Sequence, residues 1–392
     1  MKKKIVFVLY SMTVGGVEKA FLNFLSVLPL ADLDITLVLM EKKGDFLVQV
    51  PSCVKIVESE VYKHSKWIIN GVPKKVFVEL LKRGKILRAF GFAINSLYRK
   101  LTGDARMLYR FLLAKEPVLP GDYDLAIAYA GPSYLIDYYA SFKIRARKKI
   151  AWIHYDVEKF GFDVKMYASL YMKYEKVFTV SEEGKNHFIK KMPELAPRVE
   201  TFYNVISQDL IKKMAETGDT FDVADDHIKI LTVGRLSREK GQDYAVKALK
   251  IIRDRGVNAK WYFIGDGNQR ATCEQLAKEL GVGDYVCFLG TKINPYPYMK
   301  DCDIYVQPSR HEGYCITLAE ARVFGNPIVA TDFVGAKEQL VTRENALVTG
   351  FSESDIARGI MNICNTTSKK ENVSHKETSL ATNIGVLLNL LK

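Results

Sequence analysis

Two glutamates eight residues apart are the side chains in this sequence whose type and spacing most directly suggest chemistry. Glu312 lies in a loop after an apolar stretch, and Glu320 lies one turn inside a helix that we expect to begin near Ile316. If both positions were helical, the two side chains would share a face. Paired carboxylates can hold the vicinal hydroxyls of a ribose or hexose as charge-assisted acceptors. Without its surroundings, Glu320 could equally be a solvated helix residue.

The residues between the glutamates predict an anion-binding turn. Gly313 allows the backbone to bend closely around a ligand. The helix that follows would present the backbone amides of Tyr314, Cys315 and Ile316 at its N-terminus. Such amides bind phosphate or polar sugar groups.

Alternating strands and helices would position these residues. Short apolar segments rich in β-branched residues predict buried parallel strands in both halves of the chain. The pattern predicts the α/β class, with two doubly wound, Rossmann-like domains that face a cleft. The predicted strands are 4–10, 35–40, 125–130, 149–155, 177–181, 228–233, 260–264, 286–289, 303–307 and 327–331, and the predicted helices are 17–28, 242–255, 269–280 and 317–324.

The segment from Pro308 to Asp332 resembles the signature of the family-4 glycosyltransferases, the large retaining group with the GT-B fold. That signature consists of a Pro-Ser pair, two glutamates spaced as Glu-x7-Glu, a Gly-x-Pro turn and a strand. The matching residues here are Pro308-Ser309, Glu312, Glu320, Gly325-Asn326-Pro327 and the IVATD strand.

The resemblance continues over nearly all of the second half of the chain and is patchy in the first half. Upstream of the glutamates it includes a phosphate-binding element and a glycine turn, and near the N-terminus a glycine loop. The matching residues are Gly234-Arg235-Leu236 with Lys240-Gly241, Gly265-Asp266-Gly267, Asn204, Gly15-Gly16 with Glu18, Trp152–Asp156 and Val180-Ser181.

The resemblance implies a retaining transfer of a sugar from a nucleotide diphosphate donor, which acts as co-substrate, with no metal and no other cofactor. Glu320 would bind the ribose and Glu312 the donor sugar, while the first domain would bind the acceptor and bring Gly15 and Gly16 over the donor. The other residues implied to line the donor site are Gly234, Arg235, Lys240, Gly265, Gly313, Tyr314, Cys315 and Ile316.

Arg235 and Lys240 are suited to the chemistry that the resemblance implies. A nucleotide diphosphate gains negative charge as the glycosidic bond breaks, so catalysis needs fixed cations or helix dipoles beside the bridging phosphates. Arg235 follows a strand and Lys240 lies in the next loop, where they would supply this charge without a metal. The alternative for each is a surface salt bridge.

His154 ends an apolar strand of the first predicted sheet and would point into the cleft. Family members often have a His or Asp there that contacts the transferred sugar, so we expect a catalytic role for His154. Asp156 is a second candidate for this place. The alternative is a buried histidine whose hydrogen bonds are satisfied within the fold.

Three other signals point elsewhere and are rejected. Asp301 and Asp303 match the D-x-D of metal-dependent transferases, but they directly precede a strand where the family has a non-catalytic aspartate. Gly265 and Gly267 lack the third glycine of a dinucleotide fingerprint, because Arg270 occupies that place. The basic half has no recognisable nucleic-acid module, so we expect no nucleic-acid partner.

One position departs from the family pattern. After Glu312-Gly313 the common form is an aromatic residue and then a glycine, whereas here Tyr314 is followed by Cys315. A side chain at this position would lie beside the sugar site, so the departure bears on the identity of the donor.

The cysteines and the N-terminus indicate where the protein works. None of the six cysteines forms a C-x-x-C pair, and no spacing fits a zinc site or a disulfide framework, which favours a reducing cytosol. The start MKKKIVFVLY mimics a signal peptide, but its apolar run is short and no cleavage site follows, so a first strand is the better interpretation.

Positive charge is concentrated in the first half of the chain. Residues 1–205 carry the whole net charge of +12, and residues 63–115 hold 13 basic and two acidic residues. On a helical wheel, residues 75–100 gather apolar side chains on one arc and basic ones on another, although Gly84 and Gly91 leave room for two shorter helices. This pattern predicts a basic amphipathic helix on an anionic membrane, and the alternative is an apolar arc packed on the first domain.

We therefore predict a retaining hexosyltransferase-type enzyme. It would use a nucleotide diphosphate sugar, with UDP as the expected nucleotide, and a saccharide or lipid-linked acceptor in surface polysaccharide or glycolipid synthesis. We expect it in the cytoplasm, peripherally attached to the inner face of the plasma membrane. An inactive nucleotide-sugar-binding partner subunit and a GT-B-fold epimerase or phosphorylase remain alternatives. The predicted parts are an acceptor domain 1–205, a linker 206–226, a nucleotide-sugar domain 227–370 and a tail 371–392.

Overall fold

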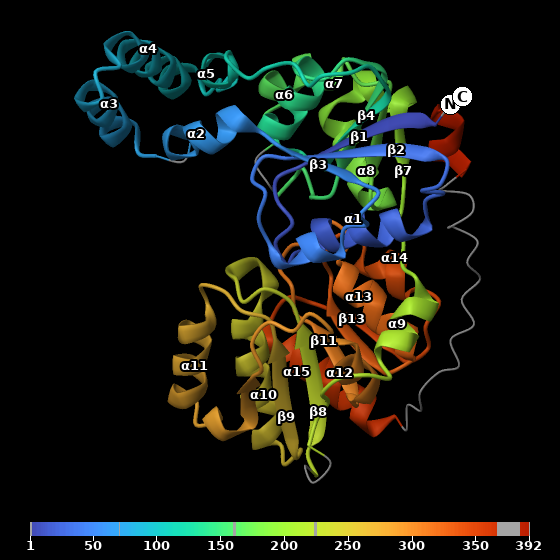
Figure 1. Ribbon diagram of the computed structural model, residues 1–392. Helices are drawn as coiled ribbons and strands as arrows, with labels where there is room; N and C mark the ends of the chain where they lie inside the picture. Colours follow the sequence, from blue (N-terminus) through green and yellow to red (C-terminus); the bar gives the residue numbers. More distant parts are fainter. Residues whose placement is uncertain (1, 70, 160–161, 223–225, 367–384, 392) are drawn as a thin grey trace. The chain divides into compact units, whose positions relative to one another are not determined.

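The computed structural model describes residues 2–69, 71–159, 162–222, 226–366 and 385–391. These residues form two compact units, each built on its own parallel sheet (Figure 1). Unit 1 comprises the described residues up to Val180, Lys185–Phe202 and residues 385–391, and unit 2 comprises Ser181–Gly184 and the described residues from Tyr203 to 366. The predicted fold class of two Rossmann-like α/β domains is confirmed.

Unit 1 contains a seven-stranded parallel sheet in the order β3-β2-β1-β4-β5-β6-β7. The strand order reverses between β1 and β4, which makes that pair a topological switch point. The central strands are almost wholly buried, because helices cover both faces of a doubly wound sheet. The strands are β1 (Lys3–Leu9), β2 (Leu33–Leu39), β3 (Lys55–Glu58), β4 (Tyr123–Gly131), β5 (Ala146–Ile153), β6 (Lys176–Thr179) and β7 (Val199–Thr201).

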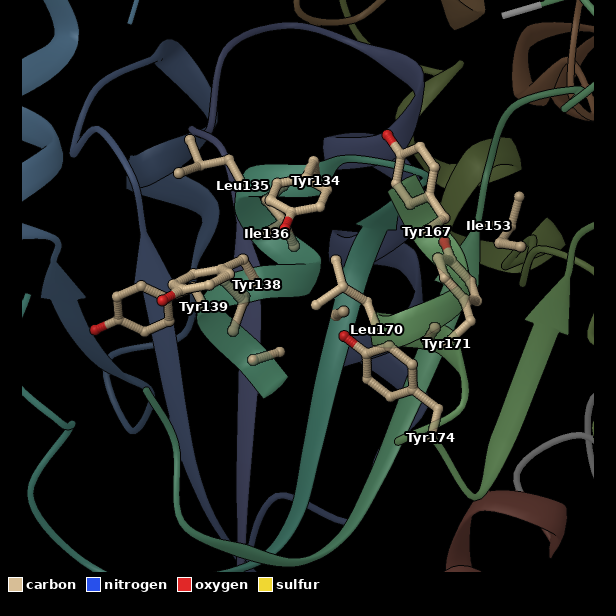
Figure 2. Packing of buried hydrophobic residues seen from close by; sticks show 14 of the residues in the cluster. Tyr134, Leu135, Ile136, Tyr138, Tyr139, Ile153, Tyr167, Leu170, Tyr171 and Tyr174 are labelled. Atoms are coloured by element: carbon tan, nitrogen blue, oxygen red, sulfur yellow. The ribbon is translucent and has the colours of Figure 1, made fainter. Parts of the chain in front are cut away.

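The helices that pack on this sheet are α1 (Gly16–Val27), α6 (Tyr134–Phe142), α7 (Val164–Tyr171) and α8 (Glu182–Lys191). Tyrosines from α6 and α7 fill much of the core on one face of the sheet (Figure 2). Tyr134 of α6 meets Tyr167 of α7 edge-to-face, and Tyr171 meets Tyr174, which follows α7, in the same way. Aromatic burial on this scale anchors the two helices to each other and to β5.

Four helices form an extension between β3 and β4 of unit 1. They are α2 (Glu60–Ile69), α3 (Pro73–Lys82), α4 (Ile86–Thr102) and α5 (Arg106–Leu113). In Figure 1, α3 and α4 lie at the end of this extension that is farther from the sheet. The predicted helix 75–100 is two helices, because Gly84 between α3 and α4 adopts a φ of +68°, which ends a right-handed helix.

Unit 2 contains a six-stranded parallel sheet in the order β10-β9-β8-β11-β12-β13, with its switch point between β8 and β11. The strands are β8 (Ile228–Val233), β9 (Ala259–Ile264), β10 (Val286–Phe288), β11 (Ile304–Gln307), β12 (Ile328–Thr331) and β13 (Ala346–Thr349). The helices are α9 (Gln208–Met214), α10 (Gln242–Asp254), α11 (Arg270–Glu279), α12 (Tyr296–Asp301), α13 (Ile316–Ala321), α14 (Ala336–Leu340) and α15 (Glu353–Asn365).

Alternate residues of the unit 2 strands belong to two separate cores. Leu231 and Val233 of β8 pack in one buried cluster, whereas Ile230 between them packs in the other. Successive side chains of a strand point to opposite faces, so a sheet covered on both sides builds two cores from one apolar run.

Three strands of the structure, β3, β7 and β13, were not predicted from the sequence. All three are edge strands, and their side chains are mostly only partly buried. The unbroken apolar run that identifies a central parallel strand is therefore absent from them.

The segment predicted as a linker, 206–226, contains helix α9 of unit 2, and its residues 223–225 lie outside the described residues. Most of the predicted tail 371–392 also lies outside them, but residues 385–390 are helical and Leu387 is buried in unit 1. No helix in the described part of the chain is both long and apolar enough to cross a bilayer.

Candidate functional site

The loops that follow β8 and β11 bring most of the predicted site residues of unit 2 together. These two strands are neighbours, and the strand order of the sheet reverses between them. Ligands of open α/β sheets bind at the carboxyl ends of the strands at such a switch point. Gly234, Arg235 and Lys240 follow β8, and Glu312 follows β11.

Lys240 and Glu312 form a charged pair at this switch point. The Lys240 Nζ lies 2.7 Å from Glu312 Oε1 and 2.8 Å from Glu312 Oε2, so it donates to both carboxylate oxygens. Glu312 is buried, with an exposed fraction of 8%. Burial acts to lower the pKa of Lys240, but the Glu312 carboxylate outweighs it and raises that pKa above its ordinary value. Lys240 is therefore a fixed cation. It does form a salt bridge, but the pair is largely buried and does not lie on the surface.

Ser309 of the Pro-Ser pair, together with Gln307 and Tyr305, which were not predicted as site residues, holds Glu312 in place. The Ser309 hydroxyl donates to Glu312 Oε1 at 2.6 Å, and Gln307 Nε2 donates to Ser309 Oγ at 2.9 Å. The Gln307 Oε1 in turn accepts from the Tyr305 hydroxyl at 2.8 Å. A glutamine at the end of an otherwise apolar strand is the sequence signal that could have revealed this network.

Glycines allow the loops at this edge to approach one another closely. A Cβ on Gly241, whose φ is +69°, would lie 2.0 Å from the Pro308 carbonyl oxygen, which joins the Lys240 and Glu312 loops. A Cβ on Gly265 would lie 2.0 Å from the Gly234 carbonyl oxygen. Only glycine fits at these contacts, which explains why the loops after β8 and β9 carry it.

Arg235 differs from Lys240 in having no partner within the described residues. Its side chain is exposed and takes part in no hydrogen bond or ion pair there. Its backbone is fixed, because the Arg235 carbonyl accepts from Gln242 Nε2 at 2.9 Å. The guanidinium is thus available to a ligand at the carboxyl end of β8.

Glu320 is buried inside unit 2. It has an exposed fraction of 2%, and its Oε1 accepts from the Tyr296 hydroxyl at 2.8 Å. Burial and the Glu320 carboxylate raise the pKa of Tyr296 well above its ordinary value, so the phenol keeps its proton and donates to Glu320. The alternative that Glu320 is a solvated helix residue is therefore wrong.

Cys315 adopts a backbone conformation that usually requires glycine. Its φ is +63°, and it is the one non-glycine residue with positive φ in the described part of the chain. The position is the N-cap of α13, directly after Gly313 and Tyr314 and before Ile316. The family pattern has glycine at this position, and the cysteine found here is strained because L residues rarely adopt a positive φ. Burial raises the pKa of the Cys315 thiol well above its ordinary value, with Glu312 as the next cause, so the thiol is inert.

The glycine loop of unit 1 follows β1. Gly15 is the N-cap of α1, and a Cβ on Gly16 would meet no atom within 4 Å, so the backbone is open on that side. The preceding residues are held in place because Met12 donates its amide to the Lys43 carbonyl at 2.9 Å. The loop therefore offers accessible backbone at a helix N-terminus, as anion binding requires.

His154 follows β5 of the same sheet and is buried. Its backbone amide donates to the Gly131 carbonyl at 2.8 Å, and its ring lies 4.7 Å from the Tyr129 ring. Burial lowers the pKa of His154 to about 3, so the ring is neutral. Its Nε2 is buried without a hydrogen-bond partner among the described residues. Among the described residues, the hydrogen bonds of His154 are therefore not all satisfied, and this nitrogen could serve a ligand.

Asp156, the second candidate beside His154, has a local role. Its Oδ1 lies 2.9 Å from His187 Nδ1 and accepts from the Glu158 amide at 3.0 Å. The aspartates of the rejected D-x-D pair also have local partners. Asp303 accepts from the Lys229 amide at 2.7 Å, and Asp301 accepts from the Thr220 hydroxyl at 2.8 Å.

A protein-family model matches much of the second half of the chain. Residues 219–378 match the model of the glycosyl transferases group 1. This stretch contains every predicted site residue of unit 2, from Gly234 to Glu320.

Several known proteins that resemble part of the chain are named as glycosyltransferases. An uncharacterised glycosyltransferase of Methanocaldococcus jannaschii is 25% identical over 166 residues, which cover 41% of each chain. A lipopolysaccharide core biosynthesis glycosyltransferase of Rhizobium meliloti is 29% identical over 135 residues, 34% of this chain and 38% of the relative. The chain thus aligns with about two fifths of these relatives.

Among solved structures, the Anabaena protein HepE in complex with UDP and glucose covers 98% of this chain and 94% of its own, with a TM-score of 0.67 at 18% identity. At this identity the likeness shows the fold, which is that of the GT-B glycosyltransferases.

Proposed function

We propose that this chain, which has the GT-B fold and whose residues 219–378 belong to the group 1 glycosyl transferases, is a retaining glycosyltransferase that uses a nucleotide diphosphate sugar. The observation that carries the proposal is the switch point of unit 2. There the largely buried Glu312–Lys240 pair lies in the loops beside β8 and β11, and Arg235 in the same β8 loop is exposed with no hydrogen-bond or ion-pair partner among the described residues. One edge of the sheet thus offers both an acceptor for sugar hydroxyls and cations for phosphates.

Unit 2 is the proposed donor domain, and its charged side chains have distinct proposed roles. Arg235 binds the diphosphate directly, and Lys240 stabilises the charge that develops on it as the glycosidic bond breaks. Glu312 accepts hydroxyls of the donor sugar with the oxygen capacity that Lys240 and Ser309 leave unused. Glu320, whose Oε1 accepts from Tyr296, binds the ribose. The backbone from Gly313 to Ile316 lines the same site.

Unit 1 is the proposed acceptor domain, and two of its loops offer polar groups for a ligand. The accessible backbone of Gly15 and Gly16 suits a phosphate, and the unpartnered Nε2 of His154 suits a sugar hydroxyl. A neutral His154 can donate or accept at this nitrogen, depending on its tautomer. Its lowered pKa argues for a hydrogen-bonding role and against proton transfer near neutral pH.

The reaction is a front-face substitution that needs no protein nucleophile. The bond between the anomeric carbon and the phosphate oxygen breaks, an acceptor hydroxyl oxygen bonds to the same face of that carbon, and the hydroxyl proton passes to the leaving phosphate. The cations at the diphosphate are side chains, so the reaction requires no metal. UDP is the proposed nucleotide, as HepE was solved with it.

The setting of the reaction is proposed from the relatives and the charge of the chain. A relative named for lipopolysaccharide core biosynthesis supports a saccharide or lipid-linked acceptor in surface glycan synthesis. The 13 basic and two acidic residues of segment 63–115 support attachment to an anionic membrane from the cytoplasmic side.

A thermal-shift screen of nucleotide sugars, with donor hydrolysis followed in parallel, tests the function. We expect one nucleoside diphosphate series to raise the melting temperature and one sugar of that series to be hydrolysed slowly without acceptor. Stabilisation with no turnover on any acceptor would favour an inactive partner subunit. Epimerised donor, or turnover that requires inorganic phosphate, would favour the epimerase or phosphorylase alternative. No stabilisation by any nucleotide sugar would contradict the proposal.

A further inference from the structure

Helix α4 exposes an apolar face on the surface of unit 1. Leu87, Ile94 and Leu101 have exposed fractions of 90%, 68% and 76%. They are spaced seven residues apart, so they lie along one face of the 17-residue helix. Four further large apolar residues on the same side are also exposed, namely Ile86, Phe90, Leu97 and Tyr98.

The opposite face of α4 is the one that packs against its own unit. Ala89 and Phe92 are buried in a small core that also contains Val76 and Leu80 of α3 and Leu108 and Leu112 of α5. A Cβ on Gly91 would lie 2.7 Å from the Phe111 ring, so α4 fits tightly against α5.

The helical wheel of residues 75–100 predicts a single apolar surface, but in the structure its residues fall into a buried group and an exposed group. The residues of that surface in α3, Val76 and Leu80, are core, whereas those in α4 face outward. For α3, the apolar residues therefore pack within the first domain, as the alternative to membrane binding predicted. The α4 face remains uncovered even though the helix already has a core of its own.

The hairpin that carries the exposed face is strongly basic. The hairpin of α3 and α4, residues 73–102, holds eight lysines and arginines and a single acidic residue, Glu79, which leaves a net charge of +7. Glu79 already pairs with Arg83 at 2.7 Å. A second copy of this chain on the same face would bring like charges together, which opposes association. Anionic lipid headgroups complement this charge, and the acyl boundary beneath them accepts the apolar side chains.

We infer that α4 is a membrane-inserting helix that places its outward face, with Leu87, Ile94 and Leu101, into the acyl boundary of an anionic membrane. The lysines and arginines of the hairpin hold it there through lipid phosphates. The core of Ala89 and Phe92 keeps the inserted face rigid, so insertion needs no refolding of the hairpin. This inference rests on the proposed membrane partner and does not depend on the transferase chemistry.

Co-sedimentation of the full chain with lipid vesicles tests the inference. Wild-type protein should bind vesicles of phosphatidylcholine with phosphatidylglycerol and should not bind phosphatidylcholine alone. The variant Leu87→Ser/Ile94→Ser/Leu101→Ser should bind the anionic vesicles roughly a hundredfold more weakly. A matched control, Val48→Ser/Ile293→Ser/Val341→Ser, replaces three aliphatic residues that are also exposed and lie elsewhere, and it should bind as wild type does.

Two further variants separate insertion from charge attraction. Lys82→Glu/Lys85→Glu/Arg88→Glu should also lose binding to anionic vesicles, because it reverses the headgroup contacts. In Phe90→Trp, the added tryptophan emission should shift to the blue with anionic vesicles and be quenched by brominated lipid acyl chains. If brominated acyl chains do not quench this emission, the face stays outside the acyl region and the inference is wrong.

Wild-type binding by the serine variant, or equal binding of wild-type protein to neutral and anionic vesicles, would overturn the inference. So would a lipid-free dimer that the serine variant converts to a monomer, because the face would then belong to a second copy. Unchanged circular dichroism, and a melting-temperature shift with nucleotide sugar equal to that of wild type, would show that the variants fold and keep the donor site. The membrane inference can thus fail while the proposed function stands.

Discussion

The Lys240 ammonium donates to both carboxylate oxygens of Glu312 across a separation of 72 residues in the sequence. The pair joins the loop after β8 to the loop after β11, and the Ser309 hydroxyl gives Glu312 a further hydrogen bond. Because Glu312 is buried, its charge depends on this partner more than the charge of an exposed carboxylate would. The same two side chains therefore serve stability and the proposed donor site.

Removing only the Lys240 charge should destabilise the fold more than removing the charges of both Lys240 and Glu312. We expect Lys240→Met to lower the free energy of unfolding by about 3 kcal/mol, because it leaves a buried carboxylate without its cation. The double variant Lys240→Met/Glu312→Gln should be more stable than that single variant. Urea denaturation of the four proteins of this cycle measures the coupling. Additive effects of the two substitutions would mean that the pair contributes nothing to folding.

Arg235 should matter for turnover and not for folding. Its side chain is exposed and unpartnered among the described residues, so Arg235→Ala should leave the free energy of unfolding unchanged. Loss of one preorganised cation at the diphosphate should reduce donor turnover about 100- to 1,000-fold. Arg238→Ala is the matched control, since Arg238 is exposed in the same loop and has no side-chain partner in the described chain. Equal turnover of the two variants would refute the phosphate role of Arg235.

Activity should persist in EDTA. The proposed positive charge at the diphosphate comes from Arg235 and Lys240, so removal of divalent cations should leave the rate of donor hydrolysis or transfer unchanged. The assay compares chelated enzyme with enzyme to which Mn²⁺ is returned. Loss of activity in EDTA with rescue by Mn²⁺ would restore Asp301 and Asp303 as metal ligands.

Asp137 should make unit 1 less stable as the pH rises. It lies on α6, where its Oδ2 accepts from the Ser133 amide at 3.1 Å. Its carboxylate also accepts from the hydroxyls of Tyr171 and Tyr174, each at 3.4 Å (Figure 2 shows these two tyrosines). Burial raises the pKa of Asp137 to about 7 in the folded chain. Because this value lies above that of the unfolded chain, the stabilisation is complete below about pH 4 and is lost as the pH rises toward 7.

The variant Asp137→Asn isolates this effect. Between about pH 4 and pH 7, one such group lowers the free energy of unfolding by ~4 kcal/mol. Asparagine does not titrate, so the variant should not show this loss. Urea denaturation of both proteins from pH 4 to pH 8 measures the difference in slope. Parallel pH profiles would show that Asp137 is ionised in the folded protein or accessible to water.

Cys315→Gly should be tolerated by the fold. Glycine adopts the φ of +63° without strain, which favours the variant by about 1 kcal/mol, while loss of the buried thiol from the unit 2 core acts in the opposite direction. Cys315→Ala keeps the strain and also loses the thiol, so it should be the less stable of the two. Thermal unfolding ranks them. A Cys315→Gly protein that is less stable than Cys315→Ala would show that packing of the thiol outweighs backbone strain.

The central strands and the order of the site motifs could be predicted from the sequence alone. Unbroken apolar runs identify strands buried on both faces, and glycines and polar residues after them mark the loops where Arg235, Lys240, Glu312 and His154 lie. The edge strands β3, β7 and β13 could not be predicted in this way, because a partly exposed edge strand does not require a long apolar run.

The tertiary structure alone decided which side chains meet and which faces are covered. The Lys240–Glu312 pair depends on β8 and β11 being neighbours, and strand order is a property of the whole sheet that no local pattern encodes. The orphaned Nε2 of His154 depends on which groups surround it, and the outward apolar face of α4 depends on α3 and α5 covering its other side. Local periodicity reports that a residue has an apolar or polar environment, whereas the identity of its neighbours is set by contacts between segments far apart in the chain.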